Sequence, residues 1–598
     1  MKHKKLLSLL LAVVLCLSLM GTALAADPAP EAEEIILLHT NDVHGEIQHY
    51  STAAALKDFY EAQGAYVLLL DAGDFIQGGP TVNLSKGATA VELMGLAGYD
   101  AAALGNHEFD FGFEVIKGLE QQASFPMLAA NVLFEGKPAF RDRMVFTSPA
   151  GTKLGVFALA TPETATKAHP AKIQGLTFLG QSQDEDLIRC AQEQVDALRA
   201  EGCDLVICLS HLGTDAESTG HRSTDVLAQV NGIDLMIDGH SNTTLEEVRA
   251  MTGGTGILNG AYLTSTGSRL ESIGKVTILD GKITQLEELP TDSLDLIPQA
   301  AAEQRAQEIL REIDALYGTV LAQSEVLLDG EESHVRSHET NFADLVSDAM
   351  LWKVRGLGHP ADVAIFNGGN LRNPLPAGPI TRSDLLTAMP FQNDLCLVKL
   401  TGAELAQVLE VSTFCTPAPI GGFPHVAGMS LTVNTAVPFQ AGEQYPNSTY
   451  HRPASVNRVA IQSVGGQPFD PDKTYTIVTN DFLAMGGDTY YLFSQADYNV
   501  DLGLSLEEAV MEYVSQALDG VITAQQYGAS DSRLVQIQSP AALRTYTVQS
   551  GDSLWKIAQR AYGKGAQWGR IYDANRSVIR ADYTIFPGQV LTIPAVSV

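Results

Sequence analysis

The sequence of 598 residues predicts an α/β fold for the larger part of the chain. Short apolar runs alternate along it with amphipathic helical patterns, and such runs are typical of buried strands whose sheet is covered on both faces. In addition, five of the runs end abruptly in Asp, Asn or His. Because ligands bind beyond the carboxyl ends of the strands in open α/β sheets, we expect these five ends to converge on one site.

The elements of this fold follow one another in a regular order. The predicted strands are Ile35–Leu38, Tyr66–Leu70, Asp100–Leu104, Leu205–Leu209 and Ile233–Ile237. The helices predicted between them are Ala53–Ala62, Thr89–Ala97 and Asp186–Ala200. Strands that alternate with helices in this way are typical of α/β proteins, and the layout extends over residues 33–290, which we interpret as one domain.

The polar residues beyond the strand ends are candidate metal ligands. They are Asp42, His44, Asp74, Asn106, His211 and His240. Asp42 and His44 are two residues apart, so both side chains of an extended segment can reach one ion, and the Asp74 carboxylate can bridge two ions. Mixed nitrogen and oxygen ligands suit Zn, Mn, Co or Fe better than Ca. A hydrogen-bonded structural role is an equal alternative for any single His, but five such strand ends together predict a hydrolytic centre with two divalent metal ions.

Three further segments complete the organisation of the chain. Residues 291–318 are polar and rich in Ala, Glu and Gln, which predicts a helical connector, with the surface of one domain as the alternative. Residues 319–538 have their own strand and helix signals and form a second domain. After a short linker, the compact block 546–595 forms a third unit.

The first 25 residues predict a signal peptide. Lys2, Lys4 and Lys5 precede the apolar stretch Leu6–Met20, and Ala23-Leu24-Ala25 is a suitable cleavage site. An uncleaved anchor is the alternative. Since no later run has the length that a membrane-spanning helix needs, we expect an exported protein without a membrane span after cleavage.

The charge of the chain is strongly acidic, with a formal net charge of −32. The first 25 residues and the block from Tyr546 onward each carry +3, so the part between them carries −38. Such a body repels nucleic-acid polymers but permits small phosphorylated substrates, whose charge a metal site neutralises locally. The five cysteines that remain after cleavage are odd in number and lack metal-type spacing, so they predict no disulfide framework.

The strand-end motifs resemble those of a known family. Five segments resemble the five motifs of calcineurin-like metallophosphoesterases: Leu38–Gly45, Gly73-Asp74, Gly105–Glu108, Ser210-His211 and Gly239-His240. The longer sequences around these motifs resemble the secreted 5′-nucleotidase branch. The resemblance covers Ile35 to Gln538. It implies a four-layer α/β/β/α metallophosphoesterase domain followed by an α+β substrate-binding domain, the 5′-nucleotidase C-terminal domain.

The resemblance also implies a division of the ligands. Asp42, His44 and Asp74 would bind one metal, and Asp74, Asn106, His211 and His240 would bind the other. Asn242 stands where the family usually has Gln or His. This shorter side chain is a candidate ligand of the first metal, either directly or through water, and the alternative is that it leaves this metal more weakly held.

His107 and Asp110 are implied to be catalytic rather than metal-binding. Three residues apart at the start of a helix, the carboxylate can orient the imidazole and favour its cationic form. An imidazolium beside the transferred phosphoryl group would stabilise developing charge or protonate the leaving oxygen. We therefore expect hydrolysis by metal-activated water, without a covalent enzyme intermediate.

The second domain carries the residues implied to select the substrate. Arg372, in Asn367-Gly368-Gly369-Asn370-Leu371-Arg372, offers a planar fork for phosphate, although Asn370 replaces a Gly of the family pattern. Asn393 follows in Pro390–Asn393 at the expected position. The resemblance implies that Phe423 and Phe482 stack on the base and that Asp488 holds the ribose hydroxyls. The alternative for both Phe residues is a place in the core. Substrate would then bind in a cleft between the domains, which domain rotation would open.

The terminal block resembles a LysM module. The match includes Tyr546–Ala558 and Ile585–Pro594, and the helical spacing of Leu554–Ala561 and Trp568–Asn575 predicts a βααβ order. The resemblance implies that residues 546–595 bind peptidoglycan or another N-acetylglucosamine glycan. The alternative is a stabilising appendage without affinity for glycans.

Together these observations predict an exported, cell-wall-associated nucleotide phosphohydrolase of the 5′-nucleotidase type, located outside the cell or in the wall. A 2′,3′-cyclic-nucleotide 2′-phosphodiesterase with 3′-nucleotidase activity and a UDP-sugar hydrolase share these motifs and are the enzymatic alternatives. The alternative from another class is a wall-binding protein with a vestigial hydrolase centre.

Overall fold

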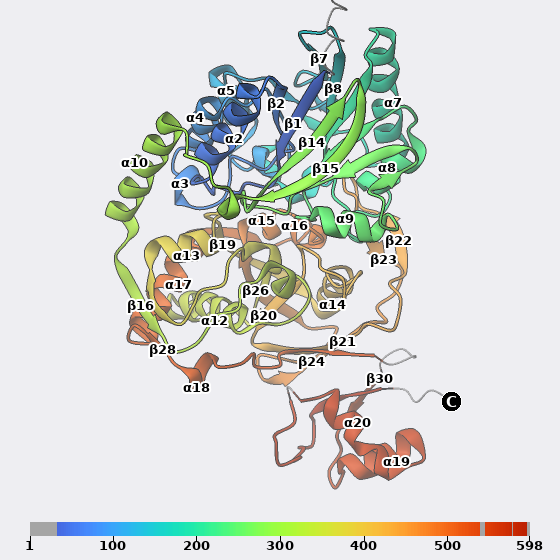
Figure 1. The fold of residues 1–598 in the computed structure, drawn as a ribbon. Coiled ribbons are helices and arrows are strands. Elements are labelled where there is room, and N and C mark those ends of the chain that lie inside the picture. Colours follow the sequence, from blue (N-terminus) through green and yellow to red (C-terminus); the bar gives the residue numbers. More distant parts are fainter. Residues whose placement is uncertain (1–32, 539–543, 577, 595–598) are drawn as a thin grey trace, which may run out of the picture.

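The computed structural model describes residues 33–538, 544–576 and 578–594. The predicted signal peptide, residues 1–25, lies outside the described residues. Two large domains and a small terminal module follow one another in space as they do in sequence (Figure 1). Among the helices of the described ranges, none is both long and apolar enough to cross a membrane.

Two six-stranded sheets form the centre of the first domain. The first sheet has the order β15 (Lys282–Pro290), β14 (Ser272–Leu279), β1 (Glu34–Thr40), β2 (Tyr66–Asp71), β3 (Ala101–Ala103) and β4 (Met127–Leu128). The second has the order β12 (Ile257–Leu258), β13 (Ala261–Thr264), β11 (Leu235–Asp238), β10 (Leu205–His211), β8 (Lys153–Ala160) and β7 (Arg143–Thr147). All five strands predicted from the apolar runs are present.

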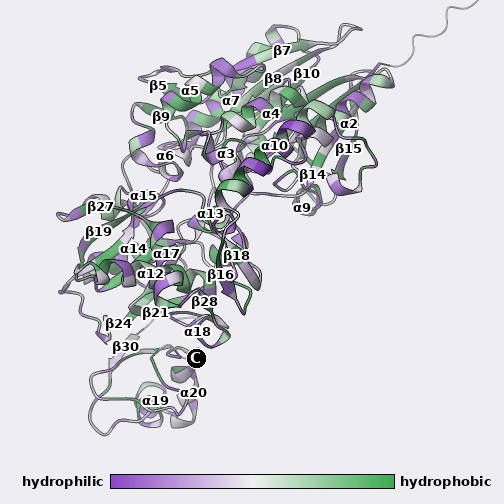
Figure 2. Cartoon of the chain, turned by 90° about the vertical axis from the view of Figure 1, so that its left-hand side faces the viewer, coloured by the Kyte–Doolittle hydropathy of each residue, from purple (hydrophilic) through white to green (hydrophobic). Residues whose placement is uncertain are grey.

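The two sheets pack face to face, and helices cover their outer faces. In β1, Ile35 and Leu37 belong to the core between the sheets, whereas Ile36 and Leu38 belong to the core under the helices. A strand with both faces buried has no polar position to offer, which explains the unbroken apolar runs. The covering helices are α2 (Tyr50–Ala62), α4 (Ala88–Ala97) and α5 (Phe113–Gln122) on the first sheet, and α7 (Asp184–Ala200), α8 (Ser223–Gln229) and α9 (Leu245–Met251) on the second. The predicted α/β/β/α layering is confirmed, and Figure 2 shows its hydrophobic interior.

The five strand ends belong to two sheets rather than to one. β1, β2 and β3 are parallel neighbours in the first sheet, and β10 and β11 are parallel neighbours in the second. Their carboxyl ends nevertheless meet, because the His240 backbone N–H beyond β11 donates to the Asp42 carboxylate beyond β1 at 3.0 Å. The convergence expected from the sequence therefore joins two sheet edges.

The segment predicted as a connector contains helix α10 (Ala300–Tyr317). Its buried residues Ala306, Ile309 and Ile313 recur at helical spacing and belong to the core of the first domain. The helix runs along that domain toward the second one (Figure 2). It is thus packed on the first domain over most of its length.

A five-stranded sheet lies at the centre of the second domain. Its order is β20 (Pro424–Ala427), β17 (Val363–Asn367), β26 (Thr474–Asn480), β19 (Asp394–Thr401) and β27 (Asn499–Ser505). Helices α12 (Asn341–Gly356) and α17 (Leu506–Glu512) cover one face and α14 (Gly402–Val411) covers the other. Two smaller sheets flank it, formed by β16 (Val320–Ser324), β18 (Gly378–Thr381) and β28 (Val521–Ile522), and by β21 (Met429–Asn434), β24 (Val459–Val464), β25 (Gln467–Pro468) and β29 (Leu534–Ile537).

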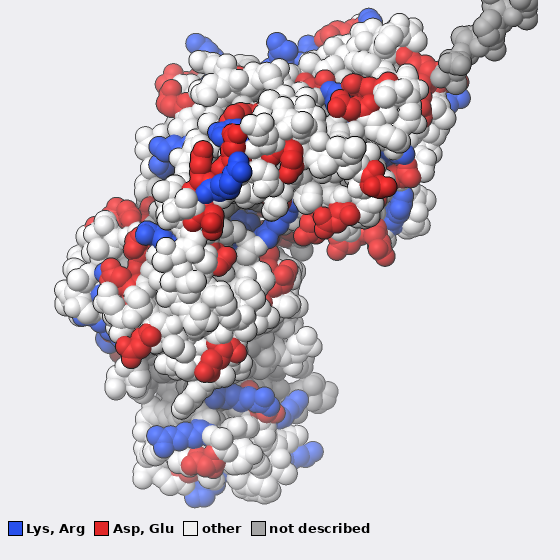
Figure 3. Space-filling model, turned by 60° about the vertical axis from the view of Figure 1, so that its left-hand side comes forward, with Lys and Arg blue, Asp and Glu red and all other residues white. Residues whose placement is uncertain are grey.

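The terminal module has the predicted βααβ order. It consists of β30 (Arg544–Thr547), α19 (Leu554–Tyr562), α20 (Trp568–Asp573) and β31 (Val590–Ile593), and its two strands pair antiparallel. The module contacts the second domain, because Gln462 Nε2 on β24 donates to Thr592 Oγ1 at 2.5 Å and Thr432 Oγ1 donates to the Ala574 carbonyl at 2.9 Å. Lys and Arg side chains gather on the visible face of this module (Figure 3). The cysteines of the described residues are all free.

Candidate metal centre and substrate cleft

A cavity of about 500 Å³ lies between the two large domains. The predicted site residues that line it are His44, Asp74, Asn106, His107, Asp110, His240 and Asn242 from the first domain, and Arg372, Asn393, Phe482 and Asp488 from the second. Asp42 and His211 are fully buried behind these residues. The strand ends of the first domain and the loops of the second therefore face one common space.

Backbone hydrogen bonds join the loops that carry the candidate ligands. The N–H of Asp42 donates to the Gly73 carbonyl at 2.9 Å, and the N–H of His44 donates to the Asp74 carbonyl at 3.1 Å. Asp42, His44 and Asp74 have φ values of 50°, 47° and 64°, in the left-handed region. Residues other than Gly rarely adopt this backbone conformation. Such strain is concentrated at functional sites, where the surrounding structure imposes it.

Asp74 lies between two groups of potential ligands. Together with His44 and His107 it forms one group, and together with His211 and His240 it forms the other. His211 Nε2 lies 3.0 Å from Asp74 Oδ2, and His44 Nε2 lies 3.9 Å from the same oxygen. A carboxylate in this position can bridge two ions.

Some ligand atoms have no hydrogen-bond partner in the described part of the chain. These buried atoms are Asn106 Oδ1 and Asn242 Oδ1, and His211 Nε2 faces the Asp74 carboxylate oxygen at 3.0 Å. The other ring nitrogen of His211, Nδ1, lies 2.7 Å from the Ala72 carbonyl, which leaves the Nε2 lone pair for a metal. Since buried polar atoms without partners are rare and unfavourable, these residues fit a pair of divalent cations.

The electrostatics of the cluster also fit bound cations. Burial raises the pKa of the Asp42 carboxyl to about 7, and although His211 lowers it, the neighbouring Asp74 adds to the rise. Crowded carboxylates that are shielded from water favour a cation between them. Asn242 lies at the edge of the cavity, where its Nδ2 donates to Glu332 Oε2 of the second domain at 3.1 Å. Its Oδ1 has no partner among the described residues and is left for a metal.

Glycines next to the ligands leave the space that the ligands occupy. A Cβ at position 105 would lie 2.2 Å from Asp74 Oδ1 and 2.6 Å from His211 Nε2. A Cβ at Gly73, where φ is 100°, would lie 2.7 Å from His211 Nδ1. The motif glycines are therefore required by close packing around the candidate metal centre.

Two buried carboxylates, for which the sequence patterns indicate no role, support the candidate ligands. Glu108 accepts hydrogen bonds from the backbone N–H groups of Asp74 at 2.8 Å and Gly105 at 2.7 Å, so it holds two ligand loops together. Glu163 Oε2 lies 2.9 Å from His240 Nε2, which directs the other ring nitrogen away from Glu163. Glu163 follows β8, so the same strand-end signal could have found it.

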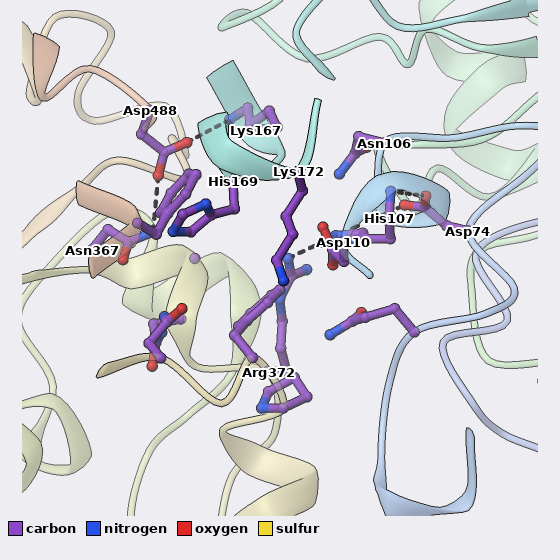
Figure 4. A pocket seen from close by; sticks show the side chains of 18 of the residues that line it. Asp74, Asn106, His107, Asp110, Lys167, His169, Lys172, Asn367, Arg372 and Asp488 are labelled. Atoms are coloured by element: carbon purple, nitrogen blue, oxygen red, sulfur yellow. Dashed lines mark hydrogen bonds and ion pairs between the residues drawn. The ribbon is translucent and has the colours of Figure 1, made fainter. Parts of the chain in front are cut away.

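His107 contacts both domains. Its Nδ1 lies 2.6 Å from Asp110 Oδ2, and Arg372 Nη2 of the second domain lies 3.0 Å from its Nε2 (Figure 4). Burial disfavours the protonated ring, but the carboxylates of Asp110 and Asp74 outweigh burial, so the pKa of His107 is raised. Arg372 also donates to Glu332 Oε1 at 2.6 Å, which orients the guanidinium.

The far end of the cavity contains Asp488 and Phe482. Asp488 accepts a hydrogen bond from Asn367 Nδ2 at 2.9 Å and lies 3.7 Å from Lys167 Nζ of the first domain (Figure 4). Burial raises the pKa of Asp488. The half-buried Phe482 lines the cavity, and its ring packs so closely against Gly487 that a Cβ there would lie 2.3 Å from it.

Phe423 is not brought to the cavity, contrary to the expectation of two rings around a base. Its side chain is fully buried in the core on the α14 face of the sheet. The Phe423 N–H donates to the Ile420 carbonyl at 3.0 Å, and its carbonyl accepts from Gly368 at 2.8 Å. This turn directs the ring inward and leaves Gly421 at the cavity wall. Phe423 thus follows the alternative interpretation, a core residue.

Three family models match successive parts of the chain. Residues 35–243 match the calcineurin-like phosphoesterase, residues 320–495 the 5′-nucleotidase C-terminal domain, and residues 546–594 the LysM domain. Together with the site, these matches define the protein as a metal-dependent phosphoester hydrolase. The chain thus combines a calcineurin-like phosphoesterase domain and a 5′-nucleotidase C-terminal domain with an additional LysM domain.

Relatives and solved structures agree with these matches. The chain is 27% identical to a 5′-nucleotidase of Vibrio cholerae over 86% of its length and 96% of that protein. It is 28% identical to the trifunctional nucleotide phosphoesterase protein YfkN of Bacillus subtilis, over 79% of its length but only 33% of that protein. The crystal structure of a 5′-nucleotidase precursor from Thermus thermophilus superposes with a TM-score of 0.70 and 26% identity, covering 85% of this chain and all of the other.

Proposed function

We propose that the protein is an exported, cell-wall-associated 5′-nucleotidase that releases phosphate from extracellular nucleotides. The observation that carries this proposal is the shared cavity, in which the candidate metal ligands of the first domain face Arg372, Phe482 and Asp488 of the second. A phosphate at the ligands and a nucleoside toward Phe482 and Asp488 would occupy both ends of the cavity. The matches to the calcineurin-like phosphoesterase and to the 5′-nucleotidase C-terminal domain support this assignment.

The residues of the cleft have distinct tasks in the proposed reaction. Divalent ions held by the strand-end ligands would supply Lewis acidity and lower the pKa of the attacking water. The adjacent positions of Arg372 Nη2 and His107 Nε2 would let both groups donate to oxygens of the phosphoryl group. Asp110 keeps the His107 ring oriented, so that a protonated ring can transfer its proton to the leaving oxygen.

A further cation of the first domain completes the environment of the phosphate. Lys172 lines the cavity, and its amino group makes no hydrogen bond or ion pair with another described residue. Figure 4 shows its side chain extending toward Arg372. An amino group without a protein partner in this position would attract an anionic substrate.

The test of the proposed activity is phosphate release from AMP, 3′-AMP and 2′,3′-cyclic AMP with Mn, Co or Zn added. We expect release from AMP to be the fastest. Faster turnover of 3′-AMP and the cyclic nucleotide would favour the phosphodiesterase alternative instead. Failure to release phosphate from any phosphoester would contradict the enzymatic proposal and favour a wall-binding protein.

We expect Phe482→Ala to raise the KM for AMP by about tenfold or more, because the stacking of a base on an aromatic ring contributes roughly 1–3 kcal/mol. The value of kcat should change much less. Phe423→Leu is the matched control, since its ring lies in the core: it should lower stability and leave KM near the wild-type value. Steady-state kinetics of both variants would measure this, and an equal rise in KM would assign base binding to Phe423 as well.

We expect the chain with its LysM module to sediment with purified peptidoglycan and a chain ending at Gln538 to remain in the supernatant. The module carries a positive charge and the rest of the mature chain a negative one, so an anionic wall attracts the module and repels the acidic body. AMP hydrolysis by the shorter chain is the control for its folding. Equal sedimentation of the two chains would contradict anchoring by this module.

A further inference from the structure

We propose that Asp329, His334 and His338 form a third divalent-metal site, on the outer surface of the second domain. One ligand atom from each residue lies within 4.8 Å of the other two. Two imidazoles and a carboxylate form a donor set that Zn, Co, Ni and Cu accept. The two His residues are exposed and Asp329 is half-buried, so water can complete the coordination. None of the three residues lines the cleft.

The two imidazoles lie four residues apart, His334 in a short helix and His338 in the bend that follows it. The N–H of His338 donates to the His334 carbonyl at 2.9 Å, and the ring centroids lie 5.0 Å apart. Residues four apart on a helix project from the same face, which is the spacing with which paired His side chains bind zinc on helices. His334 Nδ1 already lies 2.9 Å from Asp329 Oδ2, so imidazole and carboxylate are adjacent before any ion binds.

The backbone of this cluster is fixed on both sides. The N–H of Asp329 donates to Asn341 Oδ1, at the start of α12, at 2.8 Å. The carbonyl of Val335 lies 2.7 Å from Nε2 of the buried His425. Because the ligands are carried by an anchored segment, an ion has only their side chains to order, which favours binding.

The same turn also reaches the cleft. Helix α11 (Glu332–Val335) begins at Glu332, which accepts hydrogen bonds from Arg372 at 2.6 Å and from Asn242 at 3.1 Å. His334 is two residues further along and projects to the surface. An ion bound outside would restrict this turn and thereby the position of Glu332, so we expect the outer site to make the Arg372 contact more rigid.

The test compares zinc binding by the full chain and by a His334→Ala/His338→Ala double variant, using equilibrium dialysis and elemental analysis. We expect the double variant to bind one zinc ion fewer per chain. His359→Ala is the matched control, because this side chain of the same domain makes no hydrogen bond or ion pair with a described residue, and it should bind as much zinc as the wild type. Equal zinc content of wild type and double variant would overturn the proposal.

Two further measurements separate this site from folding defects and from the proposed activity. Asp329→Asn keeps the shape of the side chain but removes the charge of a direct ligand, so we expect it to weaken zinc binding at the outer site by at least about tenfold, the smallest usual effect of removing even a carboxylate that only supports a ligand. Zinc should slow hydrogen exchange in residues 329–340 of the wild type and of His359→Ala, but not of the double variant. The difference of one zinc ion between wild type and double variant does not depend on the cleft. If this difference is found but the wild type has no phosphatase activity, the proposed function is contradicted and the outer metal site is not.

Discussion

His107→Ala should lower kcat for AMP by about 10²–10⁴-fold, the usual contribution of a positioned acid or base, while the metal content of the protein stays unchanged. The physical reason is the position of the ring: its Nδ1 lies 2.6 Å from Asp110 and its Nε2 lies 3.0 Å from Arg372, at the cavity. Removal of the imidazole leaves a phosphoryl group without this donor. Turnover and elemental analysis of the same preparation would measure both quantities.

This experiment distinguishes two roles that the geometry brings close together. His107 Nε2 lies 3.9 Å from Asp74 Oδ2, and His107 shares a potential metal group with Asp74 and His44. Loss of one metal ion in the variant would therefore reassign His107 as a ligand. Asp110→Asn is the matched control, because it removes the charge that favours the protonated ring but keeps the imidazole. It should lower kcat less than His107→Ala and shift the pH profile of kcat toward lower pH.

The fold of the first domain could be predicted because its strands are buried on both faces. An element such as β2 then appears in the sequence as an unbroken apolar run, whatever its partners. The division of the strands between two sheets could not be read in this way. β1 pairs with β14, more than two hundred residues away, and this pairing depends on contacts that no local pattern records.

The site was predictable because each candidate ligand stands at a strand end or within four residues of it. Glu163, three residues after β8, has the same position, so the strand-end pattern could have indicated it as well. The failure at Phe423 has another cause. The Gly-Gly-Phe pattern indicates a tight turn, but the direction of the ring depends on which backbone groups the turn pairs with, and here these are Ile420 and Gly368. Sequence spacing therefore located the loops better than the side-chain directions within them.

The tight packing around the candidate metal centre leads to the second large effect. Gly105→Ala should abolish metal binding by Asp74, the ligand that both ions would share. It should also lower kcat by about 100-fold or more, the effect expected when catalytic groups are displaced by an ångström. The added Cβ would lie 2.2 Å from Asp74 Oδ1 and 2.6 Å from His211 Nε2, so both ligands must move. The backbone at Gly105 is not left-handed, so this effect comes from lost space and not from strain.

Gly118→Ala is the matched control for this prediction. Gly118 lies in α5, and a Cβ there would meet nothing within 4 Å. The same substitution should therefore leave metal content and turnover unchanged and raise the free energy of unfolding slightly, by up to about 1 kcal/mol, because Ala favours a helix over Gly. Metal analysis, AMP hydrolysis and urea unfolding of the two variants would show whether the damage at Gly105 is local. Full metal content together with normal turnover in Gly105→Ala would mean that Asp74 and His211 do not bind metal in the arrangement described, and the two-metal assignment would then have to be abandoned.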